Sequence, residues 1–284
     1  GRDKGRPFLQ FVHFYEPHWF VDAPRELVEG YLGSATENEN EAYYFAAVEN
    51  VDRQVGRVLK AIEEEGLREN TIVFFTSDHG PATVGKGRGR FRNFGVPDPY
   101  RGRKYGLWEG SVHVPGMMRW PAKVKAGTEW EAPCGSFDWL PSFCEWAGVA
   151  EGAGLELDGA SFAALVEGKE WVRQESLEWH HYNATLLETP NPNAVMREGS
   201  FLICGFYDER SKGTGRWVPG HMVFIRTAKL QRFTLYDLSK DLEQRKDLAA
   251  ELPERFETMK RRLSDSHLKM QKAARDWEGW KNTR

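Results

Sequence analysis

A long amphipathic segment in the first third of the chain limits the fold more than any other feature of the sequence. It carries an apolar residue at every third or fourth position: Tyr44, Val48, Val51, Val55, Val58 and Ile62. Spacings of three and four place these side chains in one stripe, which predicts a helix over residues 41–65. Gly66 follows at the position where a left-handed residue commonly ends a helix.

Apolar runs before and after this helix predict buried strands. Residues 8–14 are rich in aromatic side chains and lie between Pro7 and Pro17, while residues 71–76 are apolar on both faces. A run of the second kind suits an interior strand of a sheet covered by helices. Because a strand, a helix and a second strand form a crossover unit, the first half is predicted to be α/β, with a mainly parallel sheet flanked by helices.

The character of the sequence changes beyond about residue 175. Residues 137–148 predict one more helix before the change, and residues 252–273 predict a helix near the end of the chain. Short strands are predicted between them in four places: 194–197, 201–204, 222–225 and 233–236. Several strands followed by a helix are typical of a small antiparallel α+β subdomain. We therefore predict a larger α/β domain over residues 1–175 and a C-terminal α+β subdomain over residues 176–284.

Composition and charge exclude several classes of protein. The net charge of −3 gives no overall attraction to nucleic acid or to an anionic membrane. No apolar run approaches the roughly 18 residues that a membrane-spanning helix needs, and residues 1–7 are too polar for a signal peptide. The three cysteines lack the spacing of metal ligands. The sequence does not fix an oligomeric state.

Asp78 and His79 follow directly after the predicted strand over residues 71–76. In open α/β sheets, ligands bind beyond the carboxyl ends of the strands. A carboxylate and an imidazole can together ligate a divalent cation. The alternative from the residues alone is that Asp78 caps a turn and His79 is an ordinary polar surface residue.

His18 and Lys104 are two further candidates. His18 lies in the loop after residues 8–14, where it could donate a proton or bind an oxyanion, although a lone loop histidine often does neither. Lys104 ends a basic, glycine-rich loop over residues 85–104, which is too long for a simple connection. An ammonium group on such a segment suits a tetrahedral anion, and the alternative is a solvated basic loop.

Taken in order, these segments resemble the sulfatases of the alkaline phosphatase superfamily. The resemblance rests on Pro17-His18, on Thr76-Ser77-Asp78-His79-Gly80, and on the spacing from Lys104 to Glu109-Gly110. Residues 108–115 are similar to the family's Glu-Gly-Gly-x-Arg-x-Pro segment, and residues 235–249 resemble its C-terminal domain. The similarity extends over nearly the whole chain.

The resemblance implies an alkaline phosphatase-like fold and a sulfuric ester hydrolase, with sulfated glycans as the family's common substrates. Asp78 and His79 would ligate a divalent cation, usually Ca²⁺ in this family, although an imidazole ligand suits Mn²⁺ or Zn²⁺ better. His18 and Lys104 would hold the sulfate oxygens and neutralise or protonate the leaving oxygen. A periplasmic, secreted or lysosomal location is implied in the same way.

The sequence also departs from the family pattern. It contains no Cys-x-Pro-x-Arg or Ser-x-Pro-x-Arg motif, from which the formylglycine nucleophile is made, and it lacks the family's early Asp-Asp ligands. We expect both upstream of Gly1, so this chain alone is predicted to be inactive. Ser111 and His113 replace a Gly and an Arg of the family motif. Two alternatives stay open: a phosphodiester or phosphonate monoester hydrolase of the same superfamily, and a non-catalytic anion-binding fragment.

Overall fold

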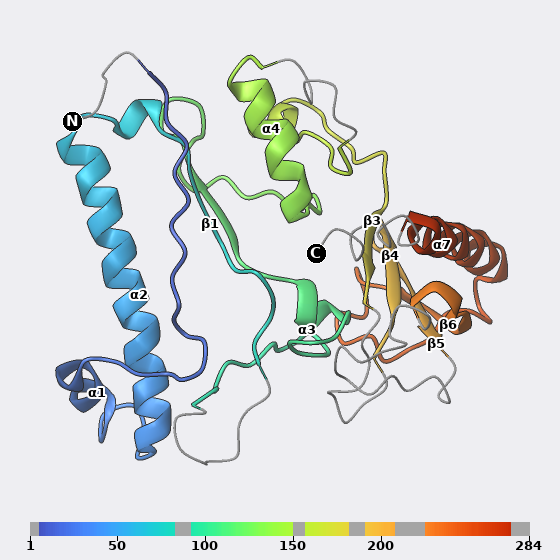
Figure 1. The fold of residues 1–284 in the computed structure, drawn as a ribbon, viewed down its shortest axis with the longest axis horizontal. Coiled ribbons are helices and arrows are strands. Elements are labelled where there is room, and N and C mark those ends of the chain that lie inside the picture. Colours follow the sequence, from blue (N-terminus) through green and yellow to red (C-terminus); the bar gives the residue numbers. More distant parts are fainter. Residues whose placement is uncertain (1–5, 83–91, 150–156, 182–190, 208–224, 274–284) are drawn as a thin grey trace, which may run out of the picture. The chain divides into compact units, whose positions relative to one another are not determined.

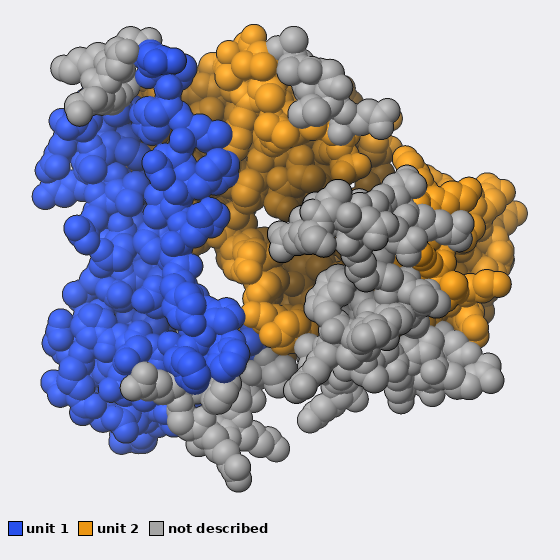
Figure 2. All heavy atoms as spheres, viewed as in Figure 1, with its two compact units in different colours: residues 1–68, 82–96 blue, residues 69–81, 97–284 orange. Residues whose placement is uncertain are grey.

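The computed structural model describes residues 6–82, 92–149, 157–181, 191–207 and 225–273 (Figure 1). The chain forms two compact units. Unit 1 comprises residues 1–68 and 82–96, and unit 2 comprises residues 69–81 and 97–284 (Figure 2). Among the helices of the described ranges, none combines the length and the apolar composition that crossing a membrane requires.

Unit 1 is built on two helices, α1 (Arg25–Tyr31) and α2 (Glu39–Glu64). α2 begins after Asn38, whose side chain accepts a hydrogen bond from the backbone N–H of Asn40 at 3.0 Å. Gly66 adopts a φ of 68° just past its end, as a left-handed helix end requires. The helix predicted over residues 41–65 is therefore confirmed. Its small residues pack against α1 in a core of Leu27, Val28, Ala42 and Ala46.

The strand predicted over residues 8–14 is wrong. The segment carries no regular secondary structure, and four of its apolar residues are half exposed or more, namely Phe8, Leu9, Phe11 and Val12. An extended segment becomes a strand only by exchanging backbone hydrogen bonds with a neighbour. No strand of the described residues pairs with this segment, so the predicted crossover to residues 71–76 is not formed.

Unit 2 contains a short sheet and several short helices. β1 (Val73–Thr76) confirms the second predicted strand and pairs antiparallel with β2 (Gly116–Arg119), with Val73 opposite Arg119. The connection between them includes α3 (Glu109–Val112). The 3₁₀-turns and the remaining short helices are η1 (Arg68–Asn70), η2 (Ser136–Asp138), α4 (Trp139–Trp146) and α5 (Ala163–Val166). η2 and α4 together confirm the helix predicted over residues 137–148.

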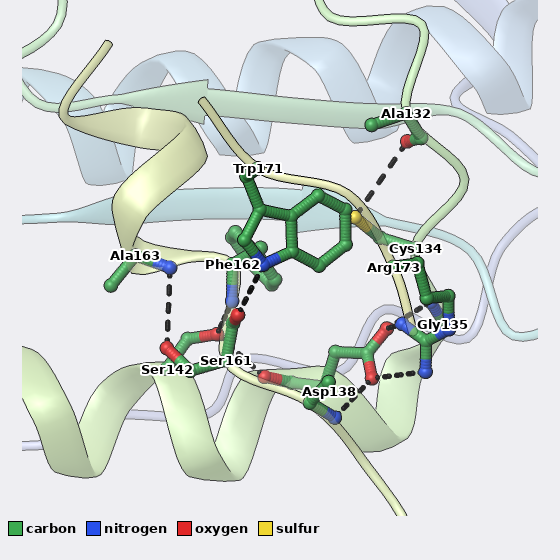
Figure 3. Close-up of polar contacts among 11 residues, drawn as sticks. Ala132, Cys134, Gly135, Asp138, Ser142, Ser161, Phe162, Ala163, Trp171 and Arg173 are labelled. Carbon is green, nitrogen blue, oxygen red and sulfur yellow. Dashed lines mark hydrogen bonds and ion pairs between the residues drawn. The ribbon is translucent and has the colours of Figure 1, made fainter. Parts of the chain in front are cut away.

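A buried ion pair holds the start of α4 to the chain that leads into the C-terminal sheet (Figure 3). Asp138 is fully buried and accepts hydrogen bonds from Nη1 and Nη2 of Arg173 at 2.7 and 2.9 Å. It also accepts from the backbone N–H groups of Gly135 at 2.7 Å and Ala160 at 2.9 Å. Four donors satisfy this carboxylate, which a buried charge requires.

The C-terminal part of unit 2 is a four-stranded antiparallel sheet in the order β3-β4-β5-β6 (Figure 1). Its strands are β3 (Leu177–His180), β4 (Ala194–Glu198), β5 (Phe201–Tyr207) and β6 (Leu230–Asp237). α7 (Pro253–Ala273) packs on one face and closes the subdomain. The predicted antiparallel α+β subdomain and its helix are confirmed.

Alternating side chains of this sheet enter two different cores. Met196, Ile203 and Leu235 pack against Met259 and Leu263 of α7. Val195, Leu202, Cys204 and Tyr236 pack on the other face, against Leu107 and Trp108. Burial on both faces explains why β5 and the first three residues of β4 are continuous apolar runs in the sequence.

The strand predicted over residues 222–225 falls mainly outside the described residues. Of residues 222–225, the first three lie outside the described residues, and Ile225 is helical rather than extended. The boundary between residues 175 and 176 stays a prediction.

Candidate functional site

Three segments of unit 2 are joined by backbone hydrogen bonds into one framework. The N–H of Gly80 donates to the carbonyl of Ser111 at 2.8 Å, which links the end of β1 to α3. The N–H of Lys104 donates to the carbonyl of Pro81 at 2.9 Å, which links the basic loop to the same turn. The structure thus brings the backbone of Lys104 next to the turn that carries Asp78 and His79.

The framework depends on two glycines, Gly80 and Gly110, at which neighbouring backbone leaves no room for a side chain. A Cβ placed on Gly80 would meet the carbonyl oxygen of Gly110 at 2.0 Å, far inside van der Waals contact. A Cβ on Gly110 would meet the carbonyl oxygens of Gly102 and Arg101 at 2.6 and 2.8 Å. The close approach of the three segments therefore excludes any side chain at either position.

Asp78 and His79 each offer a side-chain atom that can ligate a cation. The side chain of Asp78 is 81% exposed, and its Oδ2 lies 3.2 Å from Nε2 of His79. Nδ1 of His79 lies 2.8 Å from the carbonyl oxygen of Gly80. Because a carbonyl only accepts, Nδ1 must carry the proton, so Nε2 of a neutral ring presents its lone pair to a carboxylate oxygen. Two lone pairs then face each other, and a proton or a cation held by Nε2 and Oδ2 would relieve their repulsion.

This donor set fits part of a metal site. Metal-binding histidines commonly donate their second ring nitrogen to a backbone carbonyl, as His79 does. Within the described ranges, no group of three or more His, Cys, Asp or Glu side chains is arranged to hold a metal. Asp78 and His79 would therefore supply two ligands of a larger set.

Lys104 lies in a tight turn with two left-handed residues, Gly102 at φ 92° and Tyr105 at φ 74°. The N–H of Gly106 donates to the carbonyl of Arg103 at 3.2 Å and closes the turn. Nζ of Lys104 lies 5.3 Å from the centre of the Tyr105 ring, within the range of a cation–π contact. The turn holds an ammonium group and an aromatic ring side by side.

Side chains from the C-terminal subdomain support this framework. The buried carboxylate of Glu109 lies 3.2 Å from Nδ1 of His113 and 3.5 Å from Nη1 of Arg197. The fully buried Gln244 accepts from the N–H of Glu109 at 3.0 Å and, through its backbone carbonyl, from Nη1 of Arg101 at 3.2 Å. No local pattern marks Gln244, because its partners lie more than a hundred positions away. Sequence reasoning missed it for that reason.

Of the two departures from the family motif, His113 has a structural role in its side chain. It pairs with Glu109 and stacks on Tyr100 with ring centres 4.3 Å apart. Ser111 binds Gly80 through its backbone carbonyl, a contact that a Gly at this position would also make.

His18 belongs to unit 1, whereas the other three predicted site residues belong to unit 2. Its Nδ1 lies 2.6 Å from the carbonyl of Trp19, and its ring meets the edge of Tyr15 at 5.4 Å between centres. The side chain is exposed. Its convergence with Lys104 and Asp78 stays a prediction.

Two family models match the chain. The model described as Sulfatase matches residues 1–149, and the model described as N-sulphoglucosamine sulphohydrolase, C-terminal, matches residues 103–213. Among curated proteins, the steryl-sulfatase of Rattus norvegicus is 30% identical over 257 residues, which cover 88% of this chain and 42% of the relative. The chain thus spans less than half the length of this relative.

Solved structures share the fold. The crystal structure of Ps i-CgsB in complex with k-i-k-neocarrahexaose matches with a TM-score of 0.67 at 20% identity, over 89% of this chain and 48% of that one. The phosphonate monoester hydrolase of Agrobacterium radiobacter matches with a TM-score of 0.53 at 21% identity, over 83% of this chain and 44% of that one. The predicted alkaline phosphatase-like fold class is confirmed at this level, whereas the strands of both sheets in the described residues pair antiparallel instead of forming the mainly parallel sheet that was predicted.

Proposed function

The chain belongs to the sulfatase family, and from this premise we propose that the protein that carries it hydrolyses sulfate esters. The observation that supports the proposal best is the backbone framework of unit 2. It holds the Asp78–His79 turn against the Lys104 turn through the 2.9 Å hydrogen bond from Lys104 to Pro81. Two side chains that could ligate a cation and one ammonium group are thereby held in one loop cluster.

Lys104 and His18 have different tasks in the proposed reaction. Hydrolysis of a sulfate ester concentrates negative charge on the sulfate oxygens and on the leaving oxygen in the transition state. The Lys104 ammonium would hold a sulfate oxygen as a point charge. His18 would protonate the leaving oxygen, the role of a general acid.

Membership of the sulfatase family implies a divalent cation in the enzyme. We propose that Asp78 and His79 hold it, with His79 kept in the right tautomer by the carbonyl of Gly80. When bound, a divalent cation polarises the sulfate group as a Lewis acid. Ca²⁺ is the ion we propose first, since Asp78 offers carboxylate oxygens, and Mn²⁺ or Zn²⁺ would better suit the imidazole of His79.

Sulfated carbohydrates are the substrate class that we propose. The match to a structure in complex with k-i-k-neocarrahexaose supports this choice. The loop over residues 85–104 supports it too, because it carries seven Lys and Arg residues and a single acidic residue, and such a segment suits a polyanion. The match to a steryl-sulfatase makes a sulfated sterol the other candidate substrate.

Hydrolysis of a phosphonate monoester or a phosphodiester is the second candidate function. The fold shared with a phosphonate monoester hydrolase favours it. A protein that binds anions without turnover is the third, and the absence of a Cys/Ser-x-Pro-x-Arg motif from this sequence favours that reading of the chain alone. For this reason, the tests below use the protein in its natural length.

The test compares 4-nitrophenyl sulfate with a 4-nitrophenyl phosphonate monoester in wild type and in two lysine variants. Lys104→Ala is expected to lower kcat on the sulfate ester about 10²–10³-fold, the usual cost of removing one group that stabilises a developing oxyanion. Lys123→Ala is the matched control, since its Nζ also lies over an aromatic ring, 4.7 Å from the centre of Trp120, but outside the framework. It should keep the wild-type rate.

Three results would count against the proposal. Faster turnover of the phosphonate than of the sulfate ester would favour the second candidate function. Sulfate-ester turnover that Lys104→Ala leaves intact would remove Lys104 from the site. No turnover of either ester by the purified natural-length protein, supplied with Ca²⁺, Mn²⁺ or Zn²⁺ in turn, would leave only the anion-binding function.

A further inference from the structure

Tyr105 occupies a backbone conformation that suits glycine. Its φ of 74° lies in the left-handed region, which only Gln244 shares among the non-glycine residues that the structure describes. A Cβ in this region crowds the following carbonyl oxygen, and glycine avoids that cost. Residues kept in such conformations cluster at ligand-binding and catalytic sites, where surrounding contacts force the backbone.

The contacts on both sides of Tyr105 force its backbone. Lys104 is anchored to Pro81 at 2.9 Å, and Gly106 donates to Arg103 at 3.2 Å. Gly106 is closely packed as well, because a Cβ there would meet Oδ1 of Asn191 at 2.6 Å and Oγ of Ser111 at 2.8 Å. The turn therefore dictates where the side chain of residue 105 projects.

The Tyr105 side chain faces solvent and not a core. Tyr105 is 48% exposed, whereas its neighbours Leu107 and Trp108 are buried in the core beneath the C-terminal sheet. Its ring contacts the Lys104 ammonium, 5.3 Å from the ring centre. An exposed tyrosine in a strained turn gains little from burial, so packing alone does not explain why the position holds an aromatic ring.

We infer that Tyr105 determines specificity at the proposed sulfate-ester site by stacking its ring on a ring in the alcohol half of the substrate. The inference rests on the proposed function, in which Lys104 holds the sulfate. A sulfate ester joins its alcohol carbon to sulfur through one oxygen, so an alcohol ring begins next to the group that Lys104 binds. A tyrosine beside Lys104 is placed to meet that ring.

The chemistry that Tyr105 would recognise is the face of a ring. Offset or edge-to-face contacts between aromatic rings add about 0.5–1.5 kcal/mol beyond the burial of their surface, which corresponds to roughly 2- to 13-fold in affinity. An aryl ester presents an aromatic face, and a pyranose ester presents a face of ring C–H groups. An acyclic alkyl sulfate presents none, and it provides the reference substrate.

The experiment measures kcat and KM of the natural-length enzyme on 4-nitrophenyl sulfate, glucosamine 6-sulfate and butyl sulfate. Tyr105→Asn removes the ring while keeping a residue that tolerates the left-handed region. The ratio of kcat/KM for a ring-bearing ester to that for butyl sulfate should fall about 2- to 13-fold, mainly through KM. Tyr105→Phe should restore most of the lost ratio, because it restores the ring.

Two controls separate this role from others. Lys104→Ala should impair all three substrates together, because each carries the sulfate. Leu140→Asn, which removes another half-exposed apolar side chain, should leave the ratio at its wild-type value. The melting temperature of Tyr105→Asn should equal or exceed that of wild type, since the variant relieves the strain of the turn.

The outcomes decide the inference. A fall in the ratio for the aryl ester alone, for the sugar ester alone, or for both supports the inference. It also identifies which kind of substrate ring Tyr105 contacts. Equal losses of kcat/KM on all three substrates would show that Tyr105 acts only by positioning Lys104, and wild-type kcat/KM values on all three would show that the ring is not used; either result overturns the inference while the proposed function stands. A wild-type enzyme that hydrolyses none of the three would overturn both.

Discussion

The C-terminal sheet and residues 8–14 are both strongly apolar, yet the sheet is buried and residues 8–14 are largely exposed. In β4 and β5, successive side chains enter two cores, one under α7 and one against Trp108. In residues 8–14, half or more of the surface of Phe8, Leu9, Phe11 and Val12 is exposed. The difference shows that an apolar run supplies only the tendency to be buried. A pairing strand and a covering element supply the burial itself.

The largest test of this comparison is a truncation in the α7 core. Leu263 is fully buried between α7 and the sheet, so Leu263→Ala should lower the free energy of unfolding by about 2–5 kcal/mol. Leu268→Ala on the same helix is the control, because Leu268 is 52% exposed and its loss should cost less than about 0.5 kcal/mol. Urea denaturation followed by fluorescence measures both. Equal costs would mean that α7 does not pack as described.

A second test uses pH at the edge of the same interface. His267 on α7 is buried. Its ring stacks on that of His180 with centres 5.7 Å apart and lies tilted to that of Tyr207 with centres 5.6 Å apart. Burial is the main cause that lowers the pKa of His267, the neighbouring His180 lowers it further, and the bond to the Ala228 carbonyl opposes both.

The sign of this effect follows from proton binding. An unfolded histidine titrates near 6.5, above the lowered pKa in the folded chain, so the unfolded state binds more protons as the pH falls through that value. Stability contributed by neutral His267 should therefore be complete above about pH 7 and decline as the solution becomes more acidic than pH 6.5. Melting temperatures between pH 8 and pH 5 measure the decline, and His267→Gln should flatten it. A decline of equal slope in the variant would assign it to other groups.

The smallest expected effect concerns residues 8–14. Phe11 is 57% exposed, so Phe11→Ser should change the free energy of unfolding by no more than about 0.5 kcal/mol. Urea denaturation under the conditions used for Leu263→Ala makes the two values comparable. A loss of about 3 kcal/mol, as expected for a buried Phe, would show that this segment pairs and packs in solution and would restore the original strand prediction.

Helices and the C-terminal sheet were predictable because their signals are local. The apolar period of three and four located α2 within two residues at its start and one at its end, and the helix predicted over residues 252–273 corresponds to α7 (Pro253–Ala273). β2 and β3 were missed, since four-residue strands with mixed polarity carry almost no periodic signal. Whether residues 8–14 pair with a neighbour is a long-range property, which the segment itself does not encode.

The candidate site divides in the same way. Asp78, His79 and Lys104 were chosen from short motifs, and the structure brings their backbones together in one framework. The supporting contacts of Glu109 with Arg197 and Gln244 join residues far apart in the sequence, so no motif could reveal them. Tyr105 was also missed, because a left-handed φ at a tyrosine is visible only once the turn is built.

Gln244 sets a condition on how such proteins could be recombined. It reaches across the predicted boundary at residue 175 to satisfy the N–H of Glu109 and a nitrogen of Arg101. A chimera that keeps residues 1–175 and takes its C-terminal part from a relative would inherit a buried N–H at the base of α3 with no acceptor, unless the donor protein supplies an amide at the same place. Residues 1–175 and the C-terminal part should therefore be transferred together. A chimera joined between them would succeed only among relatives that share this one contact.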